Sequence, residues 1–201
     1  MRVVRETLTD EPALPPAPGA EQHLALDFAD SAYVLPGGHF IDLLGTVEST
    51  NRWLVERGLA PADVRVQEMC ATQLRVLREH IRALFAARVA RQPVLPAALS
   101  AVNDALSRTS TAALLQWDET NGPYRAAMCP PNEILDRALA TLASDAADLL
   151  TGSDADFLAT CDSVPCNRYL IRHGRRHWCS TRCGDRARAA RAYARAKSKA
   201  D

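Results

Sequence analysis

The chain has 201 residues, 47% of them hydrophobic and 24% charged, and its formal net charge is zero. This length suits one domain of roughly 150 residues with a small appendage, and the composition is that of an ordinary globular protein. No apolar run reaches the ~18 residues that a membrane helix needs, and no apolar segment precedes Pro12, so we expect neither a membrane span nor a secretory signal. We therefore expect a cytoplasmic protein whose thiols stay reduced.

The neutral total hides a strong charge asymmetry. Residues 161–201 contain eleven Lys and Arg against three Asp, a net charge of +8, so residues 1–160 carry −8. Such a division predicts that the C-terminal end meets a polyanion while the rest of the chain stays soluble.

The first half of the chain predicts a leader followed by helices. Residues 1–20 hold Pro12, Pro15, Pro16 and Pro18 and predict a flexible, extended leader. Residues 23–30 are compatible with a strand or a first helical turn, and Pro-Gly-Gly at 36–38 predicts a loop within residues 31–40. Apolar residues at steps of three and four predict helices over 41–57, 63–91 and 96–106.

The second half adds a hairpin and one more helix. Asn-Gly at 121–122 predicts a turn between strands at 114–119 and 124–128. Two prolines at 130–131 open an amphipathic helix that should end near residue 152. The fold class is therefore mainly α (α+β), with a leader over 1–20, a helical domain over 21–152 and a C-terminal cysteine module over 153–201. Cys70 and Cys129 lie outside that module, and we interpret both as structural.

Four of the six cysteines form two close pairs, which predicts a structural zinc site with the ligands Cys161, Cys166, Cys179 and Cys183. The second pair is spaced i, i+4, which places both sulfurs on one side of a helix. A close cysteine pair on a turn (the knuckle, Cys161 to Cys166), a short β-hairpin (strands at 169–171 and 177–178) and a ligand-bearing helix make a treble-clef-like finger. We expect one Zn²⁺, covered by Trp178. A buried thiol cluster and redox-labile pairs are the alternatives, and His173 and His177 are rival ligands.

A finger of ~40 residues buries little core, so its folding should depend on the metal. Chelation is therefore expected to unfold residues 161–201 and to spare the helical domain.

The C-terminal segment resembles the CGNR-type zinc finger family, named for a Cys-Gly-Asn-Arg run that reads here as Cys183-Gly184-Asp185-Arg186. The resemblance assigns the four zinc ligands to the cysteines given above. Upstream, Leu24 to Ser31 is similar to the opening of the ABATE domain that accompanies this finger, with Asp30 in place of the usual Asn. The resemblance implies a stress-induced transcription regulator whose finger binds DNA. Asp185 adds a negative charge where contact with nucleic acid is expected.

Arginines surround the last two cysteines and predict DNA as the partner, because the guanidinium suits phosphate and guanine edges. Three of them share a helix face at i, i+3 and i+7, two precede these, and two lie before Cys179. The candidate nucleic-acid contacts are Arg175, Arg176, Arg182, Arg186, Arg188, Arg191 and Arg195. The alternative is a protein–protein interaction module whose basic helix docks on an acidic partner, this chain's own helical domain included.

Catalytic motifs are absent from the sequence: there is no phosphate-binding glycine pattern and no nucleophile elbow. The carboxylate pairs Asp27/Asp30 and Asp118/Glu119 are interpreted as caps or turns, and a closed four-cysteine site leaves no position for catalysis. We therefore expect no enzyme. The helical domain remains open to two roles, a sensor with a small-molecule effector or a homodimerisation unit. For the sensor, Trp53, Trp117 and Tyr124 are the candidate pocket residues.

Overall fold

The computed structural model describes residues 14–35, 38–108, 114–118, 122–126 and 134–198. Its helices are α1 (Leu24–Ala29), α2 (Val47–Glu56), α3 (Glu68–Ala90), α4 (Pro96–Leu106), α5 (Ile134–Thr151) and α6 (Thr181–Lys197), with a 3₁₀ turn η2 (Ser153–Asp156). The strands form three antiparallel pairs: β1 (Ala32–Val34) with β2 (Phe40–Asp42), β3 (Leu114–Asp118) with β4 (Gly122–Ala126), and β5 (Leu158–Thr160) with β6 (Tyr169–Ile171). The mainly α (α+β) class is confirmed. None of the helices described is long and apolar enough to cross a membrane.

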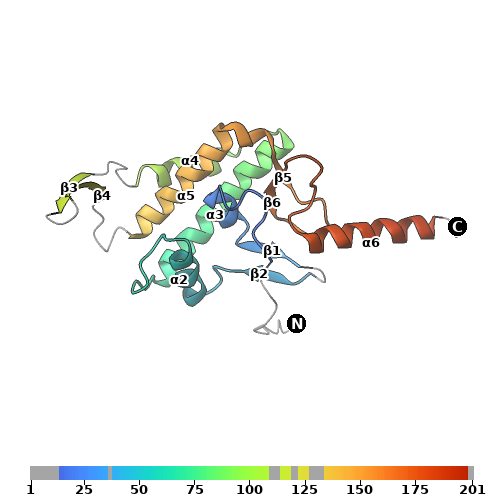
Figure 1. Ribbon diagram of the computed structural model, residues 1–201, viewed down its shortest axis with the longest axis horizontal. Helices are drawn as coiled ribbons and strands as arrows, with labels where there is room; N and C mark the ends of the chain where they lie inside the picture. The colour runs from blue at the N-terminus through green and yellow to red at the C-terminus, as the bar shows by residue number, and fades with distance from the viewer. Residues whose placement is uncertain (1–13, 36–37, 109–113, 119–121, 127–133, 199–201) are drawn as a thin grey trace.

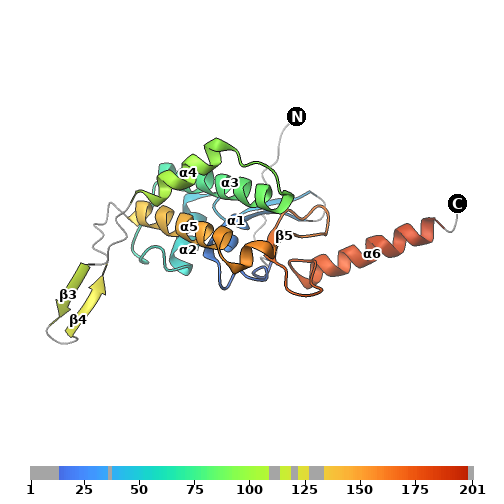
Figure 2. The same ribbon diagram turned by 90° about the horizontal axis from the view of Figure 1, so that it is seen from above.

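Helices α1 to α5 form the body of the molecule, while the β3–β4 hairpin and α6 project from opposite ends of it (Figures 1 and 2). The long helix α3 packs against α4, α5 and α1. Its apolar residues at steps of three and four face the core, as the sequence pattern predicts. The largest of the fully buried side chains on α3 and α5 are Leu74, Ile81, Phe85, Leu139, Leu142 and Leu149.

Two helices begin later than predicted, for local reasons. Residues 40–42 form β2 and pair with β1, so the first residues of the expected helix over 41–57 belong to a strand, and the loop signal at 36–38 falls between the two strands. Helix α2 then begins at Val47, because Thr46 and Ser49 form a capping box in which each side chain bonds the other's backbone N–H. Helix α3 begins at Glu68, after Val66 donates its N–H to the Asn51 side chain at 2.9 Å. The helix over 96–106 and the hairpin at 114–126 are confirmed, and Cys129 and the expected helix start at 130–131 lie outside the described residues.

The described part of the leader packs against the finger. Ala17 is 1% exposed, and the Pro18 carbonyl accepts a hydrogen bond of 2.8 Å from the Ile171 amide of β6. Gly19 adopts a φ of +93°, and a Cβ there would lie 2.4 Å from Ile171 Cγ1, so this close approach requires glycine. Residues 14–20 therefore differ from the extended, mobile segment expected, because their backbone and Ala17 complete the packing around β6.

The β5–β6 hairpin belongs to two cores at once. Leu158, Tyr169 and Ile171 pack in the main hydrophobic core with α1, α3 and α5. Ala159 and Leu170 point to the opposite face, where they pack with the cysteines in a second cluster. This division follows from the two-residue period of a strand. The finger is thus joined to the helical domain through a shared hairpin rather than through a free linker.

A buried ion pair reinforces this junction. Arg168 Nε lies 3.2 Å from Asp30 Oδ2, both side chains are at most 4% exposed, and the Tyr169 amide donates to Asp30 Oδ1 at 2.8 Å. Burial raises the pKa of Asp30 to about 7, against the lowering effect of Arg168 and the Tyr169 amide. Asp30, Arg168 and Tyr169 thus link the helical domain to the finger through buried polar contacts.

Candidate metal centre and nucleic-acid interface

The four predicted ligands lie together at one end of the finger. Their sulfur atoms all lie within 4.8 Å of one another, and three of the four cysteines are buried. Cys161 directly follows β5, and Cys166 lies at the end of the short turn after it. Cys179 and Cys183 flank the start of α6, where Ser180 caps the helix by accepting the Cys183 amide at 3.2 Å. The structure thus brings together the four residues that the sequence proposes as ligands.

The spacing fits a tetrahedral metal ion. A Zn–S bond of about 2.3 Å implies sulfur atoms about 3.8 Å apart at the corners of a tetrahedron. Cys166 Sγ and Cys179 Sγ are 3.7 Å apart, and Cys179 Sγ and Cys183 Sγ are 3.6 Å apart. These separations are far longer than a disulfide bond of about 2.0 Å, and all four are free cysteines.

The protonation of the cluster also favours a divalent cation. Hydrogen bonds from Cys166 and Cys179 lower the pKa of Cys161, and the Cys161 thiolate in turn raises the pKa of Cys166 to about 12. Adjacent thiolates repel one another, so several of them ionise together only when a cation balances their charge. Metal binding would therefore release protons from this cluster.

Two arginines and one amide surround the sulfurs. Arg168 Nη1 lies 3.9 Å from Cys179 Sγ, and Arg186 Nη2 lies 3.5 Å from Cys183 Sγ. The Cys179 amide donates to Cys161 Sγ at 3.4 Å. A zinc ion with four thiolates carries a net charge of −2, which these two guanidinium groups offset.

The strand assignment of the finger needs one correction. Residues 169–171 form the strand β6, as predicted, but residues 177–178 do not form a strand. The partner of β6 is β5, which precedes Cys161 in the chain. Trp178 is half-buried and packs against the cysteine cluster, as expected for a side chain that shields a metal. His173 and His177 are exposed and lie outside the cluster of candidate ligands; His177 Nδ1 is 3.2 Å from Asp162 Oδ2.

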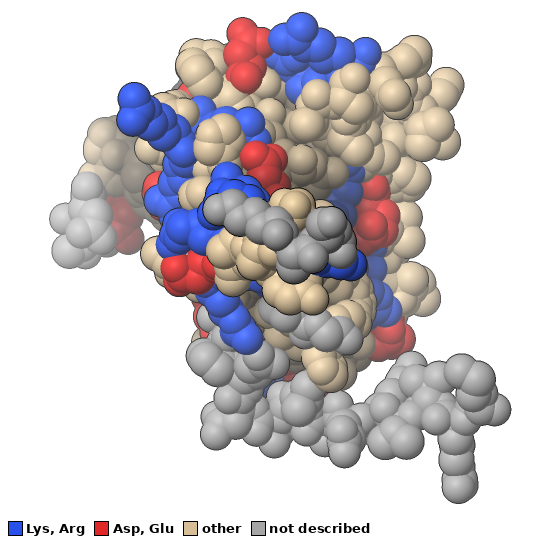
Figure 3. Space-filling model, turned by 90° about the vertical axis from the view of Figure 1, so that its right-hand side faces the viewer, with Lys and Arg blue, Asp and Glu red and all other residues tan. Residues whose placement is uncertain are grey.

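The predicted nucleic-acid contacts divide into two groups. Arg186 is half-buried and donates to the Ser163 side chain at 3.1 Å and to the Ser163 carbonyl at 3.0 Å. It therefore braces the knuckle and does not extend into solvent, which was not expected from the sequence. The other six candidates are exposed: Arg175, Arg176, Arg182, Arg188, Arg191 and Arg195. Figure 3 views this end of the molecule, where Lys and Arg side chains gather around the projecting helix with acidic side chains among them.

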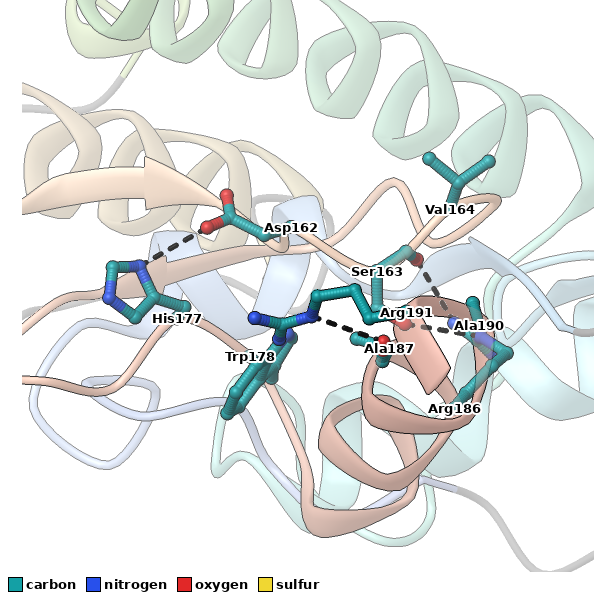
Figure 4. A pocket seen from close by; sticks show the side chains of 9 residues that line it. All are labelled: Asp162, Ser163, Val164, His177, Trp178, Arg186, Ala187, Ala190 and Arg191. Carbon is teal, nitrogen blue, oxygen red and sulfur yellow. Dashed lines mark hydrogen bonds and ion pairs between the residues drawn. The ribbon is translucent and has the colours of Figure 1, made fainter. Parts of the chain in front are cut away.

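A hollow of about 520 Å³ lies between the knuckle and α6 (Figure 4). Its lining includes Asp162 and Ser163 of the turn between the first two cysteines, Trp178, and Arg186 and Arg191 of α6. Arg191 lies against the indole of Trp178, with its Cζ atom 5.4 Å from the ring centroid. The sequence had predicted Trp178 only as a cover for the metal, so its contact with the arginines of α6 is new.

The expected aromatic pocket residues of the helical domain do not converge. Trp53 is 2% exposed in the main core, whereas Trp117 is 74% exposed and Tyr124 49% exposed on the projecting hairpin. A different cavity of about 530 Å³ lies beside Trp53, Tyr33 and Arg168.

Two carboxylates of the helical domain, Asp27 and Asp30, are both engaged: Asp27 accepts a hydrogen bond from Arg57, and Asp30 accepts one from Arg168. Cys70 is half-buried against the core, as expected.

These observations define a class of protein: a four-cysteine zinc finger built onto a helical domain, with a basic helix as the last element. Comparison with family models agrees. Residues 22–153 match the ABATE family, described as "putative stress-induced transcription regulator", and residues 158–196 match the CGNR zinc finger. Because the ABATE match spans more than half of the chain, the protein belongs to this family, and its cofactor is one structural Zn²⁺. Both families are of regulator and zinc-finger type rather than enzymes. No curated protein matches the chain.

Proposed function

We propose that this protein is a DNA-binding transcription regulator in which the zinc finger fixes α6 for contact with duplex DNA. One observation carries the proposal: every residue from Arg188 to Ser198 is exposed, so the helix projects into solvent on all sides. A helix with side chains is about 10–12 Å across, and the major groove of DNA is about 12 Å wide. This stretch presents Arg188, Arg191, Arg195 and Lys197 to such a groove.

The metal ligands in this proposal are Cys161, Cys166, Cys179 and Cys183. Their separations support a tetrahedral zinc site, and the i, i+4 spacing of the last two ties the metal directly to the first turn of α6. Forming the first turn is the unfavourable step of helix formation, so a first turn held by two metal ligands would favour the whole of α6, a helix of 17 residues. Four unpaired thiols also suit a reducing compartment such as the cytoplasm.

Phosphate contacts would come from the exposed arginines on both sides of Cys179. Arg175 and Arg176 lie on the loop before it, Arg182 lies in the first turn of α6, and the projecting face follows. With about five phosphate contacts, the log–log dependence of affinity on salt should have a slope of about −4 to −5.

The test is retardation of duplex DNA by the zinc-loaded protein at low salt. The triple variant Arg188/Arg191/Arg195→Ala should lose this retardation, because it removes three charges from the projecting helix. A matched control, Arg52/Arg65/Arg91→Ala, removes three exposed arginines from the helical domain and should bind as the wild type does. Binding by the first variant at unchanged strength and salt slope would overturn the proposal.

A second candidate function is a protein–protein interaction module whose basic helix docks on an acidic partner. The −8 charge of residues 1–160 favours it, because a second copy of this chain would supply such a surface. Salt-sensitive self-association that the same triple variant abolishes, without retardation of any duplex, would favour this function over DNA binding.

For the helical domain we propose a role as a sensor or as an oligomerisation unit. The 530 Å³ cavity beside Trp53 has the size of small-molecule sites and supports a sensor. The exposed Leu115 and Trp117 on the projecting β3–β4 hairpin support a homodimer. Sedimentation of the wild type against Trp117→Ser tests the dimer, which predicts a loss of mass for the variant.

A further inference from the structure

Trp178 lies between two arginines of α6. The Cζ atom of Arg188 lies 5.6 Å from the indole centroid and that of Arg191 lies 5.4 Å from it. Each arginine lines a different hollow beside the indole, and of the residues that the structure describes only Trp178 lines both hollows. The two guanidinium groups therefore approach the indole from different sides. Such cation–π contacts fix side chains that otherwise rotate freely in water.

The indole itself is held by the finger. Trp178 packs against the cysteine cluster and directly precedes Cys179. On its helix side it contacts Gly184, where a Cβ would lie 3.1 Å from Trp178 Cε3. A larger residue at position 184 would push the indole away from α6. The metal, the glycine and the indole thus form a rigid base for the two arginines.

Each arginine has a second restraint that leaves most of its donors free. Arg188 Nη2 donates to the Asp185 carboxylate one turn earlier, and Arg191 Nε donates to the Ala187 carbonyl at 3.2 Å. A guanidinium has five N–H donors, so each keeps a pair for a ligand. The Arg195 side chain, by contrast, makes no hydrogen bond or ion pair within the described residues.

The charges distinguish the roles of these arginines. Arg188 and Asp185 together are neutral, and the carboxylate repels phosphate, so this pair gains little from the DNA backbone. A fixed, planar guanidinium fork instead matches the O6 and N7 acceptors of guanine in the major groove. Arg195 carries an unbalanced charge on a free side chain, which suits a phosphate.

We propose that Arg188, held by Trp178 and Asp185, reads a guanine edge in the major groove, with Arg191 as its neighbour on the other side of the indole. Trp178 and Asp185 are positioning residues. This inference rests on the proposed function of α6 as the DNA-contacting helix. It also gives a role to Asp185, the residue at which this chain departs from the Cys-Gly-Asn-Arg run. In this proposal Asp185 lowers the affinity for the DNA backbone and increases the discrimination between bases.

The experiment is selection of duplexes from a random library, with affinities then measured for the selected site and for the same site with guanine replaced. The wild type should enrich guanine at a defined position. Arg188→Ala should lose about 5–150-fold of discrimination at that position, the factor that one bidentate contact supplies. Asp185→Asn should bind random duplex more tightly and discriminate less, because a negative charge and a positioning contact are both removed.

Arg195→Ala is the matched control. It should weaken binding to all sequences equally, lower the steepness of the salt dependence by about 0.9 and keep the guanine preference. Zinc content and helical circular dichroism verify that each variant is folded.

The outcomes separate the two proposals. If no duplex is retarded at low salt, the proposed function fails and this inference fails with it. If duplexes are retarded but no guanine is enriched, or Arg188→Ala weakens every sequence by the same factor as Arg195→Ala does, the inference alone is overturned.

Discussion

Removal of zinc is expected to destabilise the helical domain as well as the finger. The reason is the β5–β6 hairpin, whose residues Leu158, Tyr169 and Ile171 are 6%, 5% and 1% exposed in the main core. Its other face packs on the cysteine cluster, so loss of the metal removes the support on that side. If the hairpin then detaches, three large apolar side chains leave the core. At about 1.5–3 kcal/mol each, they cost about 5–9 kcal/mol.

This cost is comparable to the whole stability of a typical domain, about 5–15 kcal/mol. The chelated full-length chain should therefore melt more than about 10 °C below the zinc-loaded chain, followed by helical circular dichroism. Hydrogen exchange locates the effect: amides of α3 between Leu74 and Phe85 should lose protection together with residues 158–171. This expectation replaces the one drawn from the sequence, in which the helical domain survives chelation unchanged.

The coupling must also operate in the reverse direction, because linkage between two sites is reciprocal. Ile171→Ala removes a side chain that faces the helical core and should cost about 2–5 kcal/mol of stability. It should weaken zinc retention although it touches no sulfur. Tyr193→Ala, at an exposed site on α6, is the control and should change neither quantity. An unchanged melting temperature and unchanged α3 protection after chelation, with only residues 158–198 exposed, would refute the shared core as a mechanical link.

Three further predictions concern single side chains. Arg186→Ala should lower zinc affinity about 10–100-fold in competition with a chromophoric chelator, because it braces the knuckle and contacts Cys183 Sγ, whereas Arg175→Ala should not. Burial raises the pKa of Asp30 to about 7, above its pKa in the unfolded chain, so the protein loses the stability that protonated Asp30 contributes as the pH rises from the unfolded pKa through 7. Relative to Asp30→Asn, the zinc-loaded wild type should lose about 2 kcal/mol of unfolding free energy between about pH 5.5 and 7.5, measured by urea unfolding. A difference between the two proteins that does not change with pH contradicts this. Thr46→Ala should cost about 1 kcal/mol in the same assay through loss of the α2 cap, and Thr151→Ala, at the last residue of α5, should cost less.

Local signals in the sequence predict most of the elements correctly. The apolar period of α3, the proline at the start of α4 and the Asn-Gly turn of the β3–β4 hairpin act within a few residues, so they are readable without the fold. The four cysteines are equally readable, because two close pairs bring their own ligands near each other. The β1–β2 hairpin was not predicted, because Pro-Gly-Gly at 36–38 indicates a turn but does not show that the residues on either side of it form strands.

The relation between finger and body was not predictable from the sequence. It depends on contacts between residues more than 100 positions apart, such as Asp30 with Arg168 and with the Tyr169 amide. Arg168 had no signal that set it apart from the other arginines of a basic segment. The inward turn of Arg186 was hidden for the same reason, because helical spacing gives the face of a side chain but not the partner it finds.

The shared hairpin limits how an effector or a second subunit could regulate this protein. A finger on a free linker is regulated by its position, since it swings towards or away from DNA. Here Arg168 contacts Asp30 in the helical domain and Cys179 Sγ in the metal centre, so the two parts cannot move independently without breaking buried polar contacts. A ligand that bound the cavity beside Trp53 and Arg168 would therefore change how well ordered the finger is. It would do so by changing how tightly the finger retains zinc and how rigidly Trp178 is held against α6. Regulation of this kind would appear as a change in zinc exchange rate before any change in the distance between the two parts.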